Sequence, residues 1–313
     1  MLSVALCTYN GERFIGEQLQ SLSMQTFLPD ELVVADDGSD DRTLEIVSDF
    51  AETAPFAVNI IRNKEPKGVQ QNFSVASAAA QGDYVAFCDQ DDVWLPDKLS
   101  KSMTAIKQLE HLWPQQPLLV HGDLLVTDEQ LRPKYRSFMS AQGLSPEAGL
   151  DVLLVQNFVT GCTVMVNRKL LDMALPFPKY IVMHDWWLAL VAAACGHIGF
   201  LHEATIYYRQ HSHNSVGAKK YFSVNSLEKV FAGKNNYIMI LNVLRQVVNL
   251  QKRLAPSPAL NLVEEYLSCV KSGDILGIWR LGVHKQGFWR NLLFYLYLII
   301  YRRQLVLDVK EII

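Results

Sequence analysis

The sequence predicts an α/β protein with a mostly parallel sheet flanked by helices, followed by a helical C-terminal extension. Up to about residue 125, short runs of β-branched and other apolar residues alternate with helix-like segments, which is the pattern of βα units and a parallel sheet. Beyond residue 225 the hydrophobic pattern is helical. The chain has 313 residues, of which 50% are hydrophobic, so it is long enough to bury a large core.

Five strands and four helices are predicted in the first part of the chain. The strands are expected at residues 3–8, 32–36, 58–62, 84–88 and 118–121. The helices are expected to begin near Glu12, Asp41, Gly68 and Pro96. Because ligands of open α/β sheets bind beyond the carboxyl ends of the strands, polar residues just after these strands are the first candidates for a site.

The second part of the chain has a mixed pattern and then a helical one. Strands are predicted at residues 162–167 and 205–208, with a helix at 185–195 between them. Further helices are predicted at 227–254, 260–270 and 287–301, and the two prolines within residues 255–258 interrupt them.

The net charge of −3 conceals an uneven distribution. Residues 1–208 carry 14 basic and 26 acidic side chains, whereas residues 209–313 carry 15 and 6, which gives net charges of −12 and +9. A nucleic-acid-binding protein is usually basic overall, so we expect no nucleic-acid partner. The acidic and basic parts are expected to meet different partners.

The five cysteines lie far apart in the sequence and show no zinc-ligand spacing. We therefore expect small buried side chains in a reducing compartment. The first ten residues lead directly into a predicted strand and lack the pattern of a secretory signal, so export is not expected.

One apolar segment, residues 292–301, leaves two alternatives open. Ten helical residues rise only about 15 Å, roughly half the thickness of a hydrocarbon core, so a spanning helix is not predicted. The segment is flanked by Trp289 and Arg290 before it and by Arg302 and Arg303 after it. It is expected to be either a buried core helix or a helix lying in an anionic membrane interface.

Polar clusters follow three of the predicted strands: Thr8-Tyr9-Asn10, Asp36-Asp37-Gly38-Ser39 and Asp89-Gln90-Asp91-Asp92. The second cluster can also be explained as a turn, because Asp, Gly and Ser are common in turns. In the third, three carboxylates within four residues repel one another, and a cation would compensate the repulsion. Hard oxygen ligands favour Mg²⁺ or Mn²⁺, although a solvated acidic loop is the alternative.

These clusters carry a resemblance to a known family. The order T-Y-N at 8–10, VVADDGSDDRT at 33–43, N-F at 72–73 and GDYVAFCDQDDVWLPDKL at 82–99 resembles the family 2 glycosyltransferases of the GT-A fold. Within that family it is similar to the bacterial branch that includes rhamnosyltransferases for O-antigen and other surface polysaccharides. The resemblance covers residues 1–215 and implies a Rossmann-like GT-A domain there. Residues 216–313 match no motif of the family, and their hydrophobic pattern predicts a helical C-terminal region with a possible membrane-interface attachment.

The resemblance also implies roles for individual residues. Thr8 and Tyr9 match nucleotide-base contacts, and Asp36 matches the acid that accepts a hydrogen bond from the N3–H of uracil or thymine. Asp89 and Asp91 match the DxD motif, with Asp89 near the ribose and the metal and Asp91 on the Mn²⁺ or Mg²⁺ that bridges the diphosphate. The role of the adjoining acid, Asp92, stays open.

The reaction also needs a base, because a sugar hydroxyl is a poor nucleophile until its proton is removed. Asp185 opens a predicted helix and lies where the family has its catalytic acid, with His184 in place of the usual first acid. The resemblance therefore implies that Asp185 is the base, and the alternative is a helix N-cap. One base without a second carboxylate nucleophile favours a single displacement with inversion.

Four further residues are candidates for contacts with substrate. The segment 208–214 resembles the family's loop near the diphosphate, which makes Arg209 a candidate to neutralise a leaving phosphate and His211 a candidate to reach a phosphate or the metal. A surface loop without a catalytic role is the alternative. Trp186 and Trp187 are expected to divide between core packing and a platform for the acceptor sugar.

The leading hypothesis is an inverting, metal-dependent glycosyltransferase that moves a sugar from a UDP- or dTDP-sugar to a lipid-linked or oligosaccharide acceptor. Such acceptors imply a cytoplasmic enzyme held peripherally on the inner face of a bacterial membrane. One alternative is a haloacid dehalogenase-like phosphatase that uses Asp89, although that motif normally follows the first strand. The other is a sugar-binding module without activity. A dinucleotide oxidoreductase is disfavoured, since no G-x-G-x-x-G follows the first strand.

Overall fold

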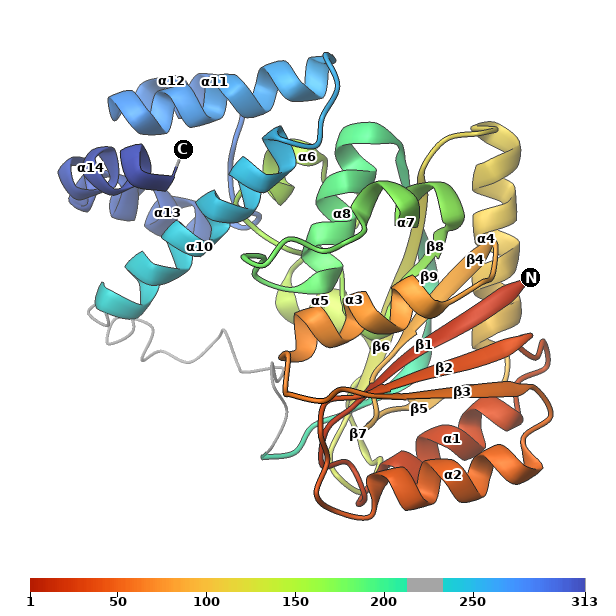
Figure 1. Cartoon of the computed structure of the whole chain (residues 1–313). Coiled ribbons are helices and arrows are strands. Elements are labelled where there is room, and N and C mark those ends of the chain that lie inside the picture. Colours follow the sequence, from red (N-terminus) through yellow and green to blue (C-terminus); the bar gives the residue numbers. More distant parts are fainter. Residues whose placement is uncertain (213–232, 313) are drawn as a thin grey trace.

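A single mixed sheet of nine strands forms the centre of the protein (Figure 1). The computed structural model describes residues 1–212 and 233–312. The strand order is β3-β2-β1-β4-β8-β6-β9-β5, and β7 pairs with β6. The strands are β1 (Leu2–Thr8), β2 (Glu31–Asp36), β3 (Ala57–Arg62), β4 (Tyr84–Cys88), β5 (Val93–Trp94), β6 (Leu118–Thr127), β7 (Pro133–Tyr135), β8 (Met165–Asn167) and β9 (His197–Arg209).

The N-terminal part of the sheet is parallel, as the alternating pattern predicts. β1 lies between β2 and β4, and β3 continues the parallel set beside β2. Every residue of β1, β2 and β4 is buried, which explains why these strands read as continuous apolar runs. The register pairs Thr8 with Asp36 and Leu6 with Cys88, so the polar residues after these strands lie at one edge of the sheet.

The remaining strands make the sheet mixed. β8 is antiparallel to both β4 and β6, and β5 is antiparallel to β9. Two predicted strands differ in extent. The one expected at 162–167 begins as a 3-10 turn, Gly161–Thr163, and the one expected at 205–208 extends back to His197, because pairing with β6 holds residues that show little hydrophobic alternation of their own.

Helices cover both faces of the sheet. In Figure 1, α1 and α2 lie on one side of the strands and α3, α7 and α8 on the other, and two separate hydrophobic clusters fill the two interfaces. The helices up to residue 195 are α1 (Ile15–Ser23), α2 (Thr43–Thr53), α3 (Val69–Ala79), α4 (Lys98–Leu112), α5 (Phe138–Gln142), α6 (Leu150–Leu153), α7 (Arg168–Ala174) and α8 (His184–Cys195).

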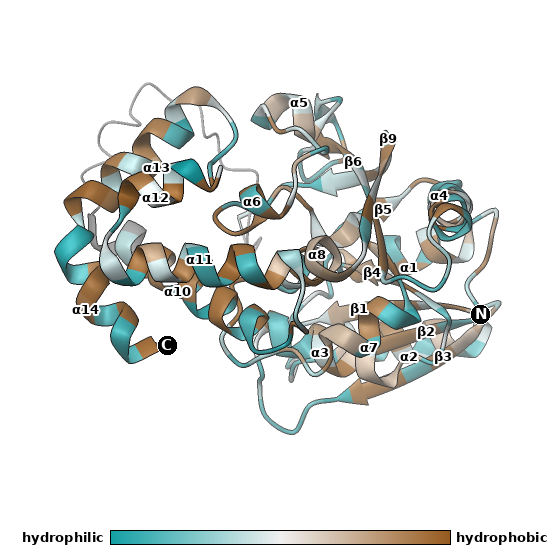
Figure 2. Ribbon diagram, turned by 90° about the horizontal axis from the view of Figure 1, so that it is seen from above, coloured by the Kyte–Doolittle hydropathy of each residue, from teal (hydrophilic) through white to brown (hydrophobic). Residues whose placement is uncertain are grey.

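The C-terminal helices pack against the α3 and α8 side of the molecule. They are α10 (Gly233–Gln251), α11 (Pro258–Ser272), α12 (Ile275–Arg280), α13 (Phe288–Ile300) and α14 (Arg302–Ile312). Leu244, Val263 and Phe294 from these helices belong to the same buried cluster as Phe73 and Trp187. The hydrophobic core therefore continues from the sheet into the C-terminal helices. Figure 2 shows hydrophobic residues along these helices as well as along the strands. The predicted helix start at 227 and the expected boundary at 215 lie outside the described residues.

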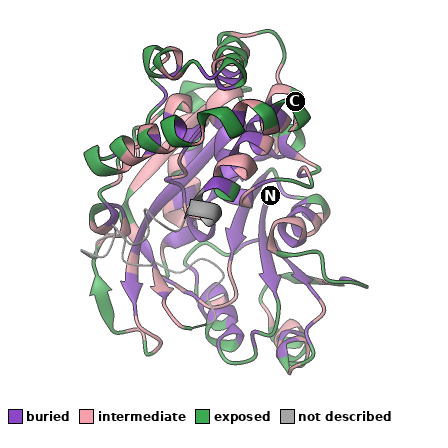
Figure 3. Cartoon of the chain, turned by 90° about the vertical axis from the view of Figure 1, so that its left-hand side faces the viewer, coloured by how far each residue is buried: buried purple, intermediate pink, exposed green. Residues whose placement is uncertain are grey.

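All five cysteines are free; Cys7, Cys88 and Cys162 are buried, and the other two are partly buried. Among residues 1–212 and 233–312, no helix is both long enough and apolar enough to cross a membrane. Figure 3 shows buried strands at the centre and exposed residues on the outer faces of the surrounding helices.

Candidate active site

The ends of β1 and β4 are joined by a reciprocal pair of hydrogen bonds. The Tyr9 N–H donates to Gln90 Oε1 at 2.9 Å, and Gln90 Nε2 donates to the Tyr9 carbonyl at 3.0 Å. A Cβ atom on Gly11 would lie 2.3 Å from Gln90 Oε1, so glycine at this position makes room for the Gln90 side chain. The Tyr9 side chain is 56% exposed beside this junction and is available to a ligand. Sequence reasoning overlooked Gln90, although it stands inside the acidic motif.

The carboxylate of Asp36 is fully buried in the turn after β2. It accepts hydrogen bonds from Thr8 Oγ1 at 2.8 Å, from the Ser39 N–H at 2.9 Å and from the Gly38 N–H at 3.1 Å. These contacts explain how an Asp-Gly-Ser turn is held next to the end of β1. A base N3–H would have to share an oxygen with these donors, and the predicted roles of Asp36 and Thr8 in base recognition stay predictions.

The acidic loop after β4 gathers carboxylates that repel one another. Burial raises the pKa of Asp89 to about 8, and the nearby charges of Asp91 and Asp185 add to the rise. Burial also raises the pKa of Asp92 well above its ordinary range, with Asp91 and Asp89 as further causes. Burial is the main cause of both shifts, and the neighbouring carboxylates add to it.

The donor set of this loop fits a hard divalent cation. Ligand atoms of Asp89, Asp92 and Cys162 lie within 4.8 Å of one another. The two carboxylates are hard ligands, whereas the Cys162 thiol is a soft one that Mg²⁺ and Mn²⁺ do not prefer. Asp92 Oδ1 accepts the Arg209 N–H at 3.1 Å, whereas its Oδ2 is buried and has no hydrogen-bond partner within the described part of the chain. Carboxylate oxygens are the ligands that Mg²⁺ and Mn²⁺ prefer, and a cation would offset their repulsion. Sequence spacing could not bring Cys162 into this group, because it arrives from a distant segment.

The segment after β9 closes over the acidic loop. His211 Nε2 lies 2.8 Å from Asp91 Oδ2, and its ring packs 4.7 Å from that of Phe14. Arg209 Nε donates to the Asp91 carbonyl at 2.9 Å, and its Nη2 donates to Glu17 at 2.8 Å. The Arg209 side chain is only 3% exposed.

The predicted contact of Arg209 with a leaving phosphate stays a prediction. In this structure its guanidinium is buried, and its donors hold the acidic loop and α1 together. The predicted contact of His211 with a phosphate or metal stays a prediction, although its position on Asp91 places it next to the acidic loop. His213 and Asn214, from the same predicted loop, lie outside the described residues.

Asp185 lies in the first turn of α8, and Met183 is the N-cap. The alternative that Asp185 itself caps the helix is wrong, because it stands two residues inside the cap. Its Oδ1 accepts the Asn157 side-chain N–H at 3.1 Å and the Trp186 N–H at 2.5 Å. Burial raises the pKa of Asp185 to about 7, while hydrogen bonds from Trp186, Gly161 and Asn157 limit the rise. A carboxyl group that titrates near neutral pH is suited to general-base catalysis.

The His184 side chain, next to Asp185, is buried between aromatic rings. Its ring stacks on Phe73 at 3.8 Å and on Phe87 at 5.7 Å between ring centroids. Within residues 1–212 and 233–312, neither ring nitrogen has a hydrogen-bond partner, and burial lowers the pKa of His184 to about 3. The imidazole is therefore neutral at physiological pH and places no positive charge beside Asp185.

We expect His184 to make the protein sensitive to acid. The folded-state pKa lies below the ordinary value of 6.5, so the unfolded chain takes up a proton below pH 6.5 that the folded chain does not. Stability is therefore complete above that pH and is lost as the pH falls toward 3, by up to roughly 1.4 kcal/mol per pH unit. As the pH falls from 6.5 to 5, the free energy of unfolding measured in urea should decrease less for His184→Phe than for the unsubstituted protein. The exposed His202→Gln is the control, and equal pH profiles for both variants would contradict the expectation.

The two tryptophans after Asp185 both belong to the core. Trp187 is 0% exposed, and its Nε1 donates to the Ala174 carbonyl at 3.0 Å. Trp186 is buried as well, and its Nε1 donates to the Leu153 carbonyl at 2.7 Å. The expectation that one of them forms a platform for the acceptor sugar is wrong for Trp187 and finds no support for Trp186, because α8 turns both indoles inward.

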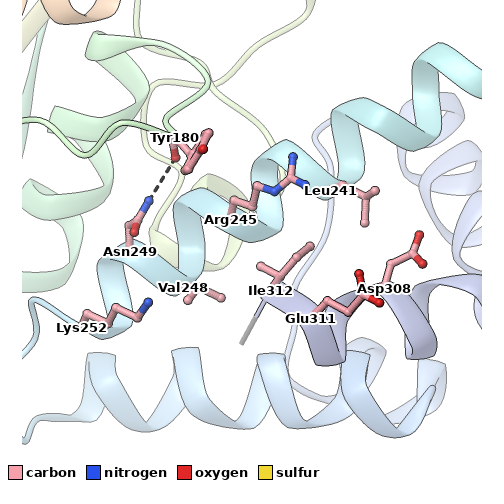
Figure 4. A pocket seen from close by; sticks show the side chains of 9 residues that line it. All are labelled: Tyr180, Leu241, Arg245, Val248, Asn249, Lys252, Asp308, Glu311 and Ile312. Atoms are coloured by element: carbon pink, nitrogen blue, oxygen red, sulfur yellow. Dashed lines mark hydrogen bonds between the residues drawn. The ribbon is translucent and has the colours of Figure 1, made fainter.

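The segment that delivers Asp185 is held from two sides. Gln70 of α3 donates to the Val182 carbonyl at 3.0 Å, and the Val182 N–H donates to Gln246 of α10 at 2.9 Å. Asn249 of α10 donates to the Tyr180 carbonyl at 3.1 Å, at the edge of a groove between α10 and α14 (Figure 4). A C-terminal helix thus takes part in positioning the candidate base, which no motif in that region indicated.

Comparison with known proteins identifies the family. Residues 3–171, more than half of the chain, match the family described as Glycosyl transferase family 2. The chain belongs to the family 2 glycosyltransferases. The matched region includes the acidic loop, so the haloacid dehalogenase-like alternative is wrong, and the predicted family is confirmed.

Three relatives and one solved structure illustrate the similarity. An uncharacterized protein of Mycobacterium tuberculosis is 30% identical over 68% of this chain and 59% of its own length. The dTDP-rhamnosyl transferase RfbG of Shigella flexneri is 27% identical over 68% of this chain and 74% of that protein. UDP-Glc:alpha-D-GlcNAc-diphosphoundecaprenol beta-1,3-glucosyltransferase WfgD of Escherichia coli is 26% identical over 61% of this chain and 68% of its own length. S. aureus TarS 1–349, solved with UDP-GlcNAc, has a TM-score of 0.58 at 20% identity and covers 98% of this chain and 88% of its own.

The structural likeness confirms the GT-A-type α/β fold with C-terminal helices. Because the match to TarS extends over 98% of the chain, it includes the helices that the sequence motifs do not reach. The match covers only 59% of the length of the Mycobacterium tuberculosis relative.

Proposed function

We propose that the protein is an inverting, metal-dependent glycosyltransferase that uses a UDP- or dTDP-sugar as donor. The observation that carries this proposal is the meeting of three features at one sheet edge: the exposed Tyr9 ring, the acidic loop Asp89–Asp92 and the buried Asp185. The influence of Asp185 on the pKa of Asp89 supports a single site in which both carboxylates face the same space.

In the proposed site, Mn²⁺ or Mg²⁺ would be held by Asp91 with Asp89, and Asp92, which lies close to Asp89, is a further ligand candidate. Such an ion, when bound, supplies positive charge to the diphosphate that leaves. His211 and Arg209 hold the loop that presents these carboxylates. Tyr9 would pack on the nucleotide base, and Asp36 would keep the surrounding turn in place.

The chemical step follows from the position of Asp185. Its carboxylate takes the proton from an acceptor hydroxyl, and that oxygen attacks the anomeric carbon of the donor sugar. A bond forms between the acceptor oxygen and the anomeric carbon while the bond from that carbon to the diphosphate breaks, and the electron pair leaves with the nucleoside diphosphate. One displacement of this kind inverts the configuration at the anomeric carbon.

The proposed acceptor is a lipid-linked or oligosaccharide glycan of bacterial surface polysaccharide synthesis, of the O-antigen type. The names of RfbG and WfgD support this choice, since one is a dTDP-rhamnosyl transferase and the other acts on a diphosphoundecaprenol-linked sugar. An acceptor anchored in lipid would bring the protein to an anionic membrane surface as a peripheral protein, on the inner face of the cytoplasmic membrane.

The donor class can be tested by thermal stabilisation. We expect UDP- or dTDP-sugars to raise the unfolding temperature in the presence of Mn²⁺ or Mg²⁺, because a ligand that binds only the folded state stabilises it by an amount that grows with the logarithm of its concentration. GDP-, ADP- and CMP-sugars serve as controls, and EDTA should abolish the shift. A larger shift with one of the control donors, or a shift that is unchanged by EDTA, would contradict the proposal.

A further inference from the structure

The outer face of α13 is apolar and uncovered in this structure. Phe288, Trp289, Leu292, Leu296, Ile299 and Ile300 are all exposed, with values from 41% for Leu296 to 73% for Phe288. Most of these positions are spaced by three or four residues, so they share one side of the helix. Contiguous apolar surface of this kind is unusual on a protein that has no partner for it.

The opposite face of the same helix is core. Phe294 and Leu298 are buried in the main hydrophobic cluster, and the Tyr295 hydroxyl donates to the Val283 carbonyl at 2.6 Å. The two alternatives for residues 292–301 therefore apply to different faces of one helix. Tyr295 therefore also lies on the packed side.

Another exposed apolar side chain lies on the neighbouring helix α12. Trp279 of α12, the helix that precedes α13, is 65% exposed. Tryptophan favours the boundary between water and hydrocarbon, because its ring is apolar while its N–H is polar. Together, the exposed apolar residues of α13 and Trp279 define what we call the α12–α13 face.

The chain segment that carries this face is basic, and the acids Asp274 and Asp308 lie just outside it. Residues 275–307 contain five Lys or Arg residues and no Asp or Glu. Arg280 ends α12, Arg302 and Arg303 begin α14, and all three side chains are exposed. Arg290 is not counted, because its guanidinium donates to the Gln142 and Gly143 carbonyls. An apolar face with a basic border is complementary to an anionic surface that has an apolar interior.

We propose that the α12–α13 face docks the protein on an anionic lipid bilayer without crossing it. A symmetric contact between two copies is disfavoured, because a two-fold interface places the same patch on both sides and would bring the two basic borders together. The proposal deepens the proposed function by naming the surface that meets the membrane, and vesicle binding can be measured without donor or acceptor.

The test is flotation of the full chain with vesicles of phosphatidylglycerol and phosphatidylcholine, compared with phosphatidylcholine alone. The double variant Trp289→Ser/Leu292→Ser should bind anionic vesicles at least about tenfold more weakly, since it removes apolar contact. Leu112→Ser/Met24→Ser is the matched control, because it removes two exposed apolar side chains from other helices or their ends. Truncation before α13 is avoided, since it would delete buried Phe294 and Leu298.

A charge variant separates the two contributions. Arg302→Gln/Arg303→Gln should weaken binding by roughly thirtyfold at low salt, at about 1 kcal/mol per basic residue, and by much less at high salt. Equal flotation of the apolar double variant and its control would overturn the proposal, as would failure of the unsubstituted protein to float. Self-association that Trp289→Ser abolishes, without vesicle binding, would assign the face to a second copy instead. Asp185→Asn should float normally, so loss of transfer and loss of docking are distinguishable.

Discussion

Replacing Asp185 with Asn is expected to lower sugar transfer at least about a hundredfold while donor nucleotide still binds. General-base catalysis commonly contributes about 10² to 10⁴ in rate, and an amide cannot accept the proton of the acceptor hydroxyl. The change is nearly isosteric, and the hydrogen bond that Asp185 Oδ1 accepts from Asn157 at 3.1 Å can persist to the remaining amide oxygen. Initial rates with the donor identified by thermal stabilisation measure the loss.

A suitable control is Asp274→Asn, which changes another carboxylate at the start of a helix, one that caps α12 through the Gly277 N–H at 2.9 Å. Both variants should bind nucleotide, but only Asp185→Asn should lose transfer. Near-normal transfer by Asp185→Asn would remove it from the role of base and leave it as a residue that organises the first turn of α8.

Replacing Asp91 with Asn is expected to weaken metal-dependent binding of UDP or dTDP by at least about tenfold. Even groups that only support a metal ligand are commonly worth about 10- to 100-fold in metal affinity, and a ligand itself should be worth no less. The change also removes the charged partner of His211, which lies 2.8 Å away. Titration calorimetry with nucleotide and Mn²⁺, and again with EDTA, measures the effect.

Asp97→Asn provides the comparison for this experiment. Asp97 follows the acidic loop closely in sequence but pairs with Lys101 at 2.7 Å on the surface of α4. Its replacement should leave the metal-dependent affinity unchanged. If Asp91→Asn and Asp97→Asn bind nucleotide equally well with and without EDTA, the metal assignment of the loop is incorrect.

The sequence alone determined the fold class, the parallel order of the first strands and the edge at which the polar clusters meet. This was possible because each cluster directly follows a strand whose apolar run has to be buried on both faces. Once β1, β2 and β4 pair in parallel, Thr8, Asp36 and Asp89 are placed at one edge without further information. The position of Asp185 at a helix start is local in the same sense.

Only the tertiary structure decided what the individual side chains contact. The Arg209 guanidinium is buried because it donates hydrogen bonds to Glu17 and to the Asp91 carbonyl, which lie in distant segments. His184 is neutral because it is buried against Phe73 and Phe87. In α13, apolar residues lie on all sides of the helix, so the sequence does not indicate which side is buried. Packing against the core determines it. Burial and hydrogen bonds of this kind arise between residues that are far apart in the chain, so they cannot be predicted from the local spacing of residues.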